Sequence, residues 1–161
     1  MTNINLKMGV LCRYLLLLMT ILGALNAILR YLSKFVGVAL NSNALVEMQW
    51  YLFGSIFMLG AGYTLTKSRH VRVDIVYGNL SPKYRRLIDI MGTLLFLLPF
   101  CLASIWLSWD FVLKSWEQWE MSSDAGGLPR YPIKTIIPIG FALLFIEGLR
   151  ELKRLLTSQE A

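Results

Sequence analysis

Two apolar runs of membrane length, separated by a strongly basic segment, constrain the fold of this chain more than any other feature. The runs cover residues 48–66 and 90–109 and contain no charged side chain. Each is close to the roughly 20 apolar residues that an α-helix needs to span a bilayer. Because clustered Lys and Arg side chains resist translocation, we expect the segment that joins the runs, residues 62–86, to lie on the cytoplasmic side. It holds six basic residues: Lys67, Arg69, Arg72, Lys83, Arg85 and Arg86.

The composition excludes an ordinary soluble domain. Hydrophobic residues make up 56% of the chain and charged residues only 16%, whereas charged residues are roughly 25% of a typical soluble domain. The net charge of +6 could indicate a nucleic-acid partner. The basic residues gather at the ends of the apolar runs, however, where they contact anionic lipid headgroups and orient helices. We therefore expect membrane lipids as partners and no nucleic acid.

The remaining apolar runs complete the prediction of one all-α integral membrane domain, residues 1–161, with four transmembrane helices. No small-residue cleavage site follows the first run, so we expect it to be retained as a helix. Most of the 16 Lys and Arg residues lie on the side of the central basic segment, which predicts that both termini are cytoplasmic. Pro99 is expected to kink the third helix. The four helices are expected at about residues 10–31, 44–66, 82–110 and 133–156.

Small residues at helical spacing indicate faces where helices meet. Gly23 and Ala27 share a stripe of the first helix, and Gly54 and Ala61 share a face of the second. Each stripe could close the four-helix unit or face another subunit, and the sequence leaves both alternatives open.

Charged and aromatic side chains mark the outer end of the first two helices. In a helical hairpin, Arg30 and Glu47 would lie at similar depth, and an ion pair would relieve both of an unpaired charge near the bilayer. The alternative is that each side chain reaches water separately. Trp50 and Tyr51 suit the aromatic belt of the membrane interface.

The sequence offers few groups for catalysis or cofactor binding. His70 is the only histidine, so one chain cannot supply bis-histidine haem ligation, and no His/Cys metal motif occurs. Cys12 and Cys101 fall inside predicted helices without CxxC spacing, which argues against a disulfide or thiol chemistry. The acidic residues lie near helix ends or in loops, so the chain offers no ion path of its own. We predict neither an enzyme nor a cofactor-binding protein.

Two regions, residues 47–89 and 127–141, carry a resemblance to a known family. Residues 50–55 read WYLFGS and residues 60–76 read GAGYTLTKSRHVRVDIV, while GLPRYPIK at 127–134 is followed by IPIGF at 137–141. With four predicted crossings, these stretches resemble the small membrane subunit of tripartite ATP-independent periplasmic (TRAP) transporters. The HVRVD segment at 70–74 is the most specific part of the resemblance.

The resemblance implies a function and a set of partners. Such transporters of the bacterial inner membrane combine a periplasmic substrate-binding protein, a large membrane subunit that carries the substrate and sodium sites, and this small subunit. They take up organic acids on a sodium gradient, and the large subunit moves its substrate domain like an elevator against a fixed scaffold. The small subunit would pack on that scaffold and enlarge it.

Two groups of residues become interface candidates on this basis. Residues of the outer segment would contact the binding protein, although the segment could also merely link two helices; they are Glu117, Glu120, Arg130 and Tyr131. The cytoplasmic stretch would act as a structural clamp in which Asp74 pairs with a basic neighbour; its members are Arg69, His70, Arg72 and Asp74. Valines and Ile75 alternate with charged residues there, which alone suggests a strand, but a lone strand has no partner and we favour a short piece on the membrane surface.

Two alternatives remain at the level of sequence. A small self-assembling channel or exporter would need a charged residue deep in a helix. A membrane anchor of a redox enzyme would bind haem or quinone.

Overall fold

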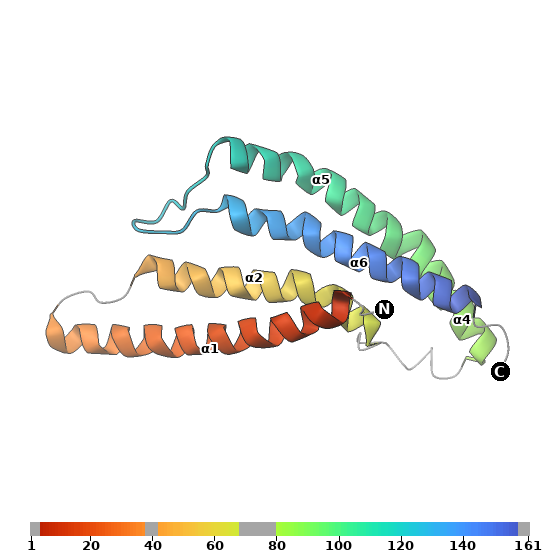
Figure 1. Ribbon diagram of the computed structural model, residues 1–161, viewed down its shortest axis with the longest axis horizontal. Coiled ribbons are helices and arrows are strands. Elements are labelled where there is room, and N and C mark those ends of the chain that lie inside the picture. The colour runs from red at the N-terminus through yellow and green to blue at the C-terminus, as the bar shows by residue number, and fades with distance from the viewer. Residues whose placement is uncertain (1–3, 38–41, 68–79, 158–161) are drawn as a thin grey trace.

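The computed structural model describes residues 4–37, 42–67 and 80–157, and every regular element among them is helical (Figure 1). Four helical rods, one of them made of α4, η1 and α5 in succession, are long and apolar enough to cross a membrane. The prediction of an all-α membrane protein with four spanning helices is therefore confirmed. The elements are α1 (Ile4–Val36), α2 (Asn43–Thr66), α4 (Pro82–Met91), the π-helical turn η1 (Gly92–Leu97), α5 (Leu98–Glu117) and α6 (Tyr131–Thr157).

Two rods are longer than the sequence predicts. The first helix begins at Ile4 and ends at Val36, whereas residues 10–31 were expected, and the third continues to Glu117 beyond residue 110. Hydropathy marks only the part of a helix that fits the hydrocarbon, while the backbone hydrogen bonds continue through polar residues beyond it. α1 ends where Gly37 takes a left-handed conformation with φ of 72°.

The helices lie side by side in one layer, in the order α1, α2, α6, α5 (Figure 1). α2 packs on α1 and on α6, and α6 packs on α5 and on α4. The long rods α1 and α5 thus form the two edges of the layer. A layer of this kind leaves broad helix surfaces on its two faces.

Few side chains are buried between the helices of the layer. Many large apolar side chains of all four rods are exposed, among them Phe96 and Trp106. A water-soluble protein rarely exposes so much contiguous apolar surface, but in a bilayer lipid tails or another subunit cover it. The buried hydrophobic residues among those described are Leu52, Leu98, Cys101, Val112 and Leu143.

The third rod changes its hydrogen-bond pattern just before Pro99. At the end of η1, the amide of Leu98 donates to the carbonyl of Thr93, a step of five residues instead of four. Pro99 has no N–H to donate and its ring crowds the preceding turn of a regular α-helix. The wider π-helical turn accommodates this ring, so the distortion expected at Pro99 takes the form of a π-helical segment.

The layer has two distinct ends (Figure 1). The start of α1, the end of α2, α4 and the end of α6 lie at one end, which we call the terminal end. At the opposite end, α5 joins α6 through residues 118–130, and we call it the hairpin end.

Candidate functional site

Residues 118–130 form a short hairpin. Its arms meet in an isolated antiparallel bridge between Met121 and Pro129. The amide of Arg130 donates to the carbonyl of Glu120 at 2.8 Å, which closes the hairpin next to α6. The Gly- and Pro-rich segment between α5 and α6 therefore has a defined backbone.

Glu47, in the first turns of α2, ties this hairpin to the layer. It is only 4% exposed. The amide of Leu128 donates to one carboxylate oxygen at 2.6 Å, and the hydroxyl of Ser122 donates to the other. One turn further along α2, the hydroxyl of Tyr51 donates to the carbonyl of Pro129 at 3.3 Å. Two side chains of α2 thus hold both arms of the hairpin.

The ion pair between Arg30 and Glu47, one of the two alternatives that the sequence leaves open, is not formed. Both carboxylate oxygens of Glu47 accept hydrogen bonds from the hairpin, and Arg30 lies exposed on α1. Within the described ranges, no ion pair of Arg30 is found. The sequence indicates that the two residues lie at similar depth. It does not indicate that a backbone amide 81 residues after Glu47 donates a hydrogen bond to the Glu47 carboxylate.

Glu120 binds α5 and α6 together at the base of the hairpin. Its carboxylate pairs with the Lys134 ammonium of α6 and accepts a hydrogen bond from the Ser115 hydroxyl of α5 at 2.7 Å. The Lys134 hydrogen bond, followed by that of Ser115, lowers the pKa of Glu120 below its ordinary value of 4.5. The same ammonium lies 4.0 Å from the centre of the Phe111 ring, a cation–π contact.

An aromatic cluster covers the end of α5. The rings of Trp116 and Tyr131 lie 4.6 Å apart between centroids, and those of Trp119 and Tyr131 lie 5.3 Å apart. The indole N–H of Trp116 donates to the Thr135 hydroxyl at 2.8 Å. Tyr131, predicted as a contact residue, is therefore half-buried among side chains of its own chain.

The four residues predicted to contact the binding protein differ in how exposed their side chains are. Glu117 lies exposed on the last turn of α5. Glu120 and Arg130, like Tyr131, are half-buried, and Glu120 uses its carboxylate inside the chain. The exposed rim of the hairpin contains Trp119 and Met121 instead, two large side chains that the sequence reasoning did not select as contacts. Their only signal in the sequence is that apolar residues interrupt a polar loop.

One face of α2 is open along most of its length. Trp50, Gly54, Phe57 and Ala61 recur at the spacing of a single helical face, and both aromatic side chains are exposed. A methyl group added at Gly54 would meet no atom within 4 Å.

Hollows flank this open face of α2. One of about 230 Å³ lies between Gly54 and residues of α5 and α6, including Phe111. A second of about 270 Å³ lies between Ala61 and the rings of Phe100 and Phe141. The small-residue stripe of α2 therefore does not close the layer, whereas Gly23 of α1 faces the Gln49 side chain of α2.

A buried polar cluster joins three helices at the terminal end. Asn5 of α1, which is fully buried, donates to the Glu147 carboxylate of α6 at 2.8 Å. Gly62 of α2 provides the space that the Asn5 side chain occupies, because a methyl group at Gly62 would lie 2.6 Å from Asn5 Oδ1. Arg150 donates to the same carboxylate at 3.2 Å. Sequence reasoning missed this cluster, since Asn5 lies outside the apolar run that marked the first helix; its spacing of four residues from the small Gly9 was the available signal.

The cytoplasmic candidates Arg69, His70, Arg72 and Asp74 lie outside the described residues. In the part of the chain that the structure does describe, no group of three or more His, Cys, Asp or Glu side chains could hold a metal ion.

Comparison with known proteins gives one family. The sequence model of the family described as tripartite ATP-independent periplasmic transporters, DctQ component, matches residues 19–158. A search of curated proteins found no match. The family match covers all of α2, α4, α5 and α6 and the second half of α1.

Proposed function

The chain belongs to the DctQ family of TRAP transporter components, and from this premise we propose that it is the accessory subunit that enlarges the fixed part of such a transporter. As a member of that family it is a small, multi-pass subunit of the inner membrane, and the family is one of transporter components and not of enzymes. The partners in this proposal are a large permease subunit and a periplasmic binding protein. The resemblance supports organic acids as the substrates and sodium as the coupling ion.

The open face of α2 carries the proposal. A single layer of helices exposes two faces to its surroundings, and one of them presents Gly54 and Ala61 beside two hollows. Small residues let the backbone of a neighbouring helix come close, and van der Waals packing is the main source of helix association in lipid. We assign this face to the large permease subunit, with Trp50 and Phe57 packing against its helices.

The layer is suited to a fixed part because its ends are tied. At the hairpin end, Glu47 and Glu120 join α2, α5 and α6 through the hairpin. At the terminal end, Asn5 and Glu147 join α1 to α6. A subunit that resists sliding of its helices at both ends can support a neighbouring domain that moves.

The hairpin end is assigned to the periplasmic binding protein. Trp119 and Met121 are exposed there on a backbone that internal hydrogen bonds hold in place. Exposed aromatic and Met side chains on a rigid support are typical of contact surfaces between proteins. The stretch from Arg69 to Asp74, which lies outside the described residues, keeps its proposed role as a structural clamp.

Two measurements test the proposal. Sodium-driven uptake is measured in liposomes that contain the large subunit and the binding protein, with and without this chain; undiminished uptake in its absence would count against an obligatory role. Co-purification with the large subunit is then measured for the variant Gly54→Leu/Ala61→Leu, which fills the two hollows. We expect at least about a tenfold loss of co-purified partner, since both changes separate the packed helices.

A matched control keeps this test specific. Ala24→Leu/Ala103→Leu adds similar apolar volume at two exposed positions of α1 and α5. This variant should co-purify as the unchanged chain does. Equal co-purification of the Gly54→Leu/Ala61→Leu variant would show that another face receives the large subunit.

A further inference from the structure

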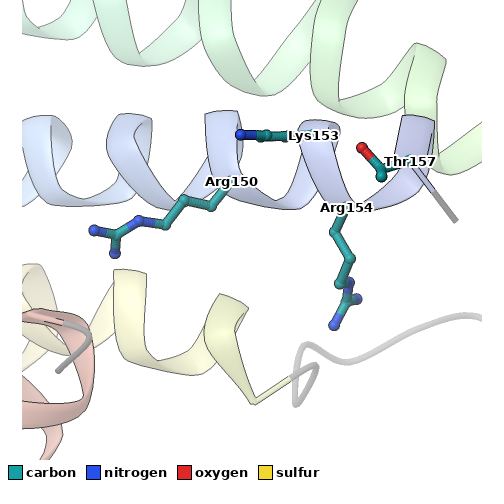
Figure 2. Close-up of a pocket in the computed structure, with 4 residues that line it drawn as sticks. All are labelled: Arg150, Lys153, Arg154 and Thr157. Atoms are coloured by element: carbon teal, nitrogen blue, oxygen red, sulfur yellow. The ribbon is translucent and has the colours of Figure 1, made fainter. Parts of the chain in front are cut away.

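The last three turns of α6 carry a basic cavity that the proposed function does not use. The cavity has a volume of about 410 Å³ and is lined by Arg150, Lys153, Arg154 and Thr157. Arg150 and Arg154 extend to the same side of α6, one turn apart, while Lys153 and Thr157 lie at the other edge of the helix in this view (Figure 2). Three cationic side chains thus line one open recess at the terminal end of the molecule.

The positive charge of the cavity exceeds the acidic charge beside it. Arg150 pairs with Glu147 at 3.2 Å and Arg154 pairs with Glu151 at 2.5 Å, yet the two arginine side chains stay 47% and 58% exposed. Lys153 is exposed, and within residues 4–37, 42–67 and 80–157 no acidic side chain forms an ion pair with it.

A further cation closes the end of the helix. Arg86 of α4 donates to the Leu155 carbonyl at 2.7 Å and to the Leu156 carbonyl at 3.2 Å. These contacts satisfy carbonyl groups that have no partner within the helix and oppose the negative end of its dipole. The recess therefore presents a net positive field.

Apolar side chains lie on the same helix face as Lys153, next to the face of the two arginines. Ile146, Leu149 and Lys153 recur at steps of three and four residues, so they share one face of α6, and both apolar side chains are exposed. A free anion would use only the basic groups. A molecule with an anionic head and long hydrocarbon chains would use the basic groups and the apolar side chains together.

We propose that this cavity binds the headgroup phosphate of an anionic phospholipid whose acyl chains lie along Leu149 and Ile146 of α6. Basic pockets at the end of transmembrane helices are suited to such headgroups, because Arg and Lys donate to phosphate oxygens at the depth where the hydrocarbon ends. The bound lipid fixes the end of α6 at the membrane surface. The proposal depends on the membrane location of the chain and not on the identity of its partners.

Native mass spectrometry of the purified full chain tests the proposal, with phosphatidylglycerol as the probe and phosphatidylcholine of the same acyl chains as the comparison. The unchanged chain should retain phosphatidylglycerol preferentially. Lys153→Gln/Arg154→Gln should reduce its retention about fivefold or more, since each cation near the membrane surface adds to the attraction for an anionic headgroup. The conservative variant Lys153→Arg/Arg154→Lys should retain it.

Controls separate the lipid from other causes. Arg30→Gln/Lys34→Gln removes the same number of positive charges from exposed positions near the C-terminal end of α1, far from the cavity. It should leave retention of phosphatidylglycerol unchanged. Lys153→Glu leaves the pair between Arg154 and Glu151 intact and should lower retention by itself. Equal retention of the two lipids by the unchanged chain, or equal retention of phosphatidylglycerol by both double-Gln variants, would overturn the proposal. Displacement of the lipid by millimolar inorganic phosphate would also overturn it, since the site would then be one for small anions.

Discussion

Trp119 takes a backbone conformation that glycine usually supplies. Its φ is 48°. The amide of Trp119 donates to the Trp116 carbonyl at 3.2 Å and the amide of Glu120 to the Ser115 carbonyl at 3.0 Å, which is the Schellman pattern at the end of α5. A side chain in this region costs about 1–2 kcal/mol. The ring contacts of Trp119 with Tyr131 and Trp116 offset that cost and start the hairpin in a fixed direction.

The two contributions at Trp119 can be separated by mutation. Trp119→Ala removes the ring contacts but keeps the unfavourable free energy of a side chain at positive φ. Trp119→Gly removes both the ring contacts and that unfavourable term. We therefore expect Trp119→Gly to unfold at a higher temperature than Trp119→Ala, by an amount equivalent to about 1 kcal/mol. Gly37→Ala serves as the reference, because φ at Gly37 is 72° and a methyl group there meets no atom within 4 Å. If Trp119→Ala proves more stable than Trp119→Gly, the positive φ is not unfavourable at this position and the ring contacts do not compensate for it.

Glu120 makes the hairpin sensitive to acid. Its pKa is lower in the folded protein than the ordinary 4.5, because Lys134 and Ser115 stabilise the carboxylate. The resulting stability is present above about pH 4.5 and is lost as the pH falls through the lower, folded pKa. Hydrogen exchange of the Arg130 amide, which donates to the Glu120 carbonyl, should therefore show reduced protection at low pH. In Glu120→Gln this acid dependence should be absent; an unchanged acid dependence would assign it to another group.

The contact between α2 and α6 depends on one glycine. A methyl group at Gly140 would lie 2.8 Å from both the Cβ and the carbonyl oxygen of Met58, so the helices would have to separate. We expect Gly140→Ala to lower the free energy of unfolding by roughly 1–3 kcal/mol. Gly54→Ala is the matched control, since open space surrounds Gly54 and alanine favours a helix by up to about 1 kcal/mol. Chemical unfolding in detergent distinguishes them, and equal effects of both changes would contradict this packing.

The helices could be predicted from the sequence more fully than their arrangement. Length and hydropathy are enough to recognise a membrane-spanning rod, so the existence of all four was confirmed. Lipid tails are as apolar as a protein interior, however, and the side of a helix that meets lipid need not differ from the side that meets a helix. For that reason the stripes of Gly23 and Gly54 looked alike, although a methyl group at Gly23 would lie 3.3 Å from the Gln49 side chain of α2 and one at Gly54 would meet no atom within 4 Å.

At the hairpin end, prediction from the sequence failed for a different reason. Glu47 was singled out as a charge that needed a partner, and it does have partners. They are a hydroxyl and a backbone amide of a loop far along the chain, which no local pattern connects to α2. The exposed candidates of that loop could be recognised as polar residues, but its Schellman turn replaces the usual glycine with Trp119 and so gave no turn signal.

The whole layer is asymmetric in charge between its two ends. Basic residues gather at the terminal end, where Arg86, Arg150 and Lys153 lie near the ends of α4 and α6. The hairpin end has charges of both signs in contact, as in the pair of Glu120 and Lys134. Since clustered cations are held on the cytoplasmic side, we expect the terminal end to face the cytoplasm and the hairpin to face the periplasm.

Cysteine labelling in cells tests this orientation. Asp124→Cys in the hairpin and Tyr84→Cys on α4 replace exposed side chains at opposite ends, in a background with Cys12 and Cys101 changed to Ala. After permeabilisation of the outer membrane, an impermeant maleimide should label the hairpin variant in intact cells and the α4 variant only after the inner membrane is broken. The reverse pattern would place the basic end outside. It would also remove the hairpin from the side of the binding protein, so that the contact assigned to Trp119 and Met121 would be lost with it.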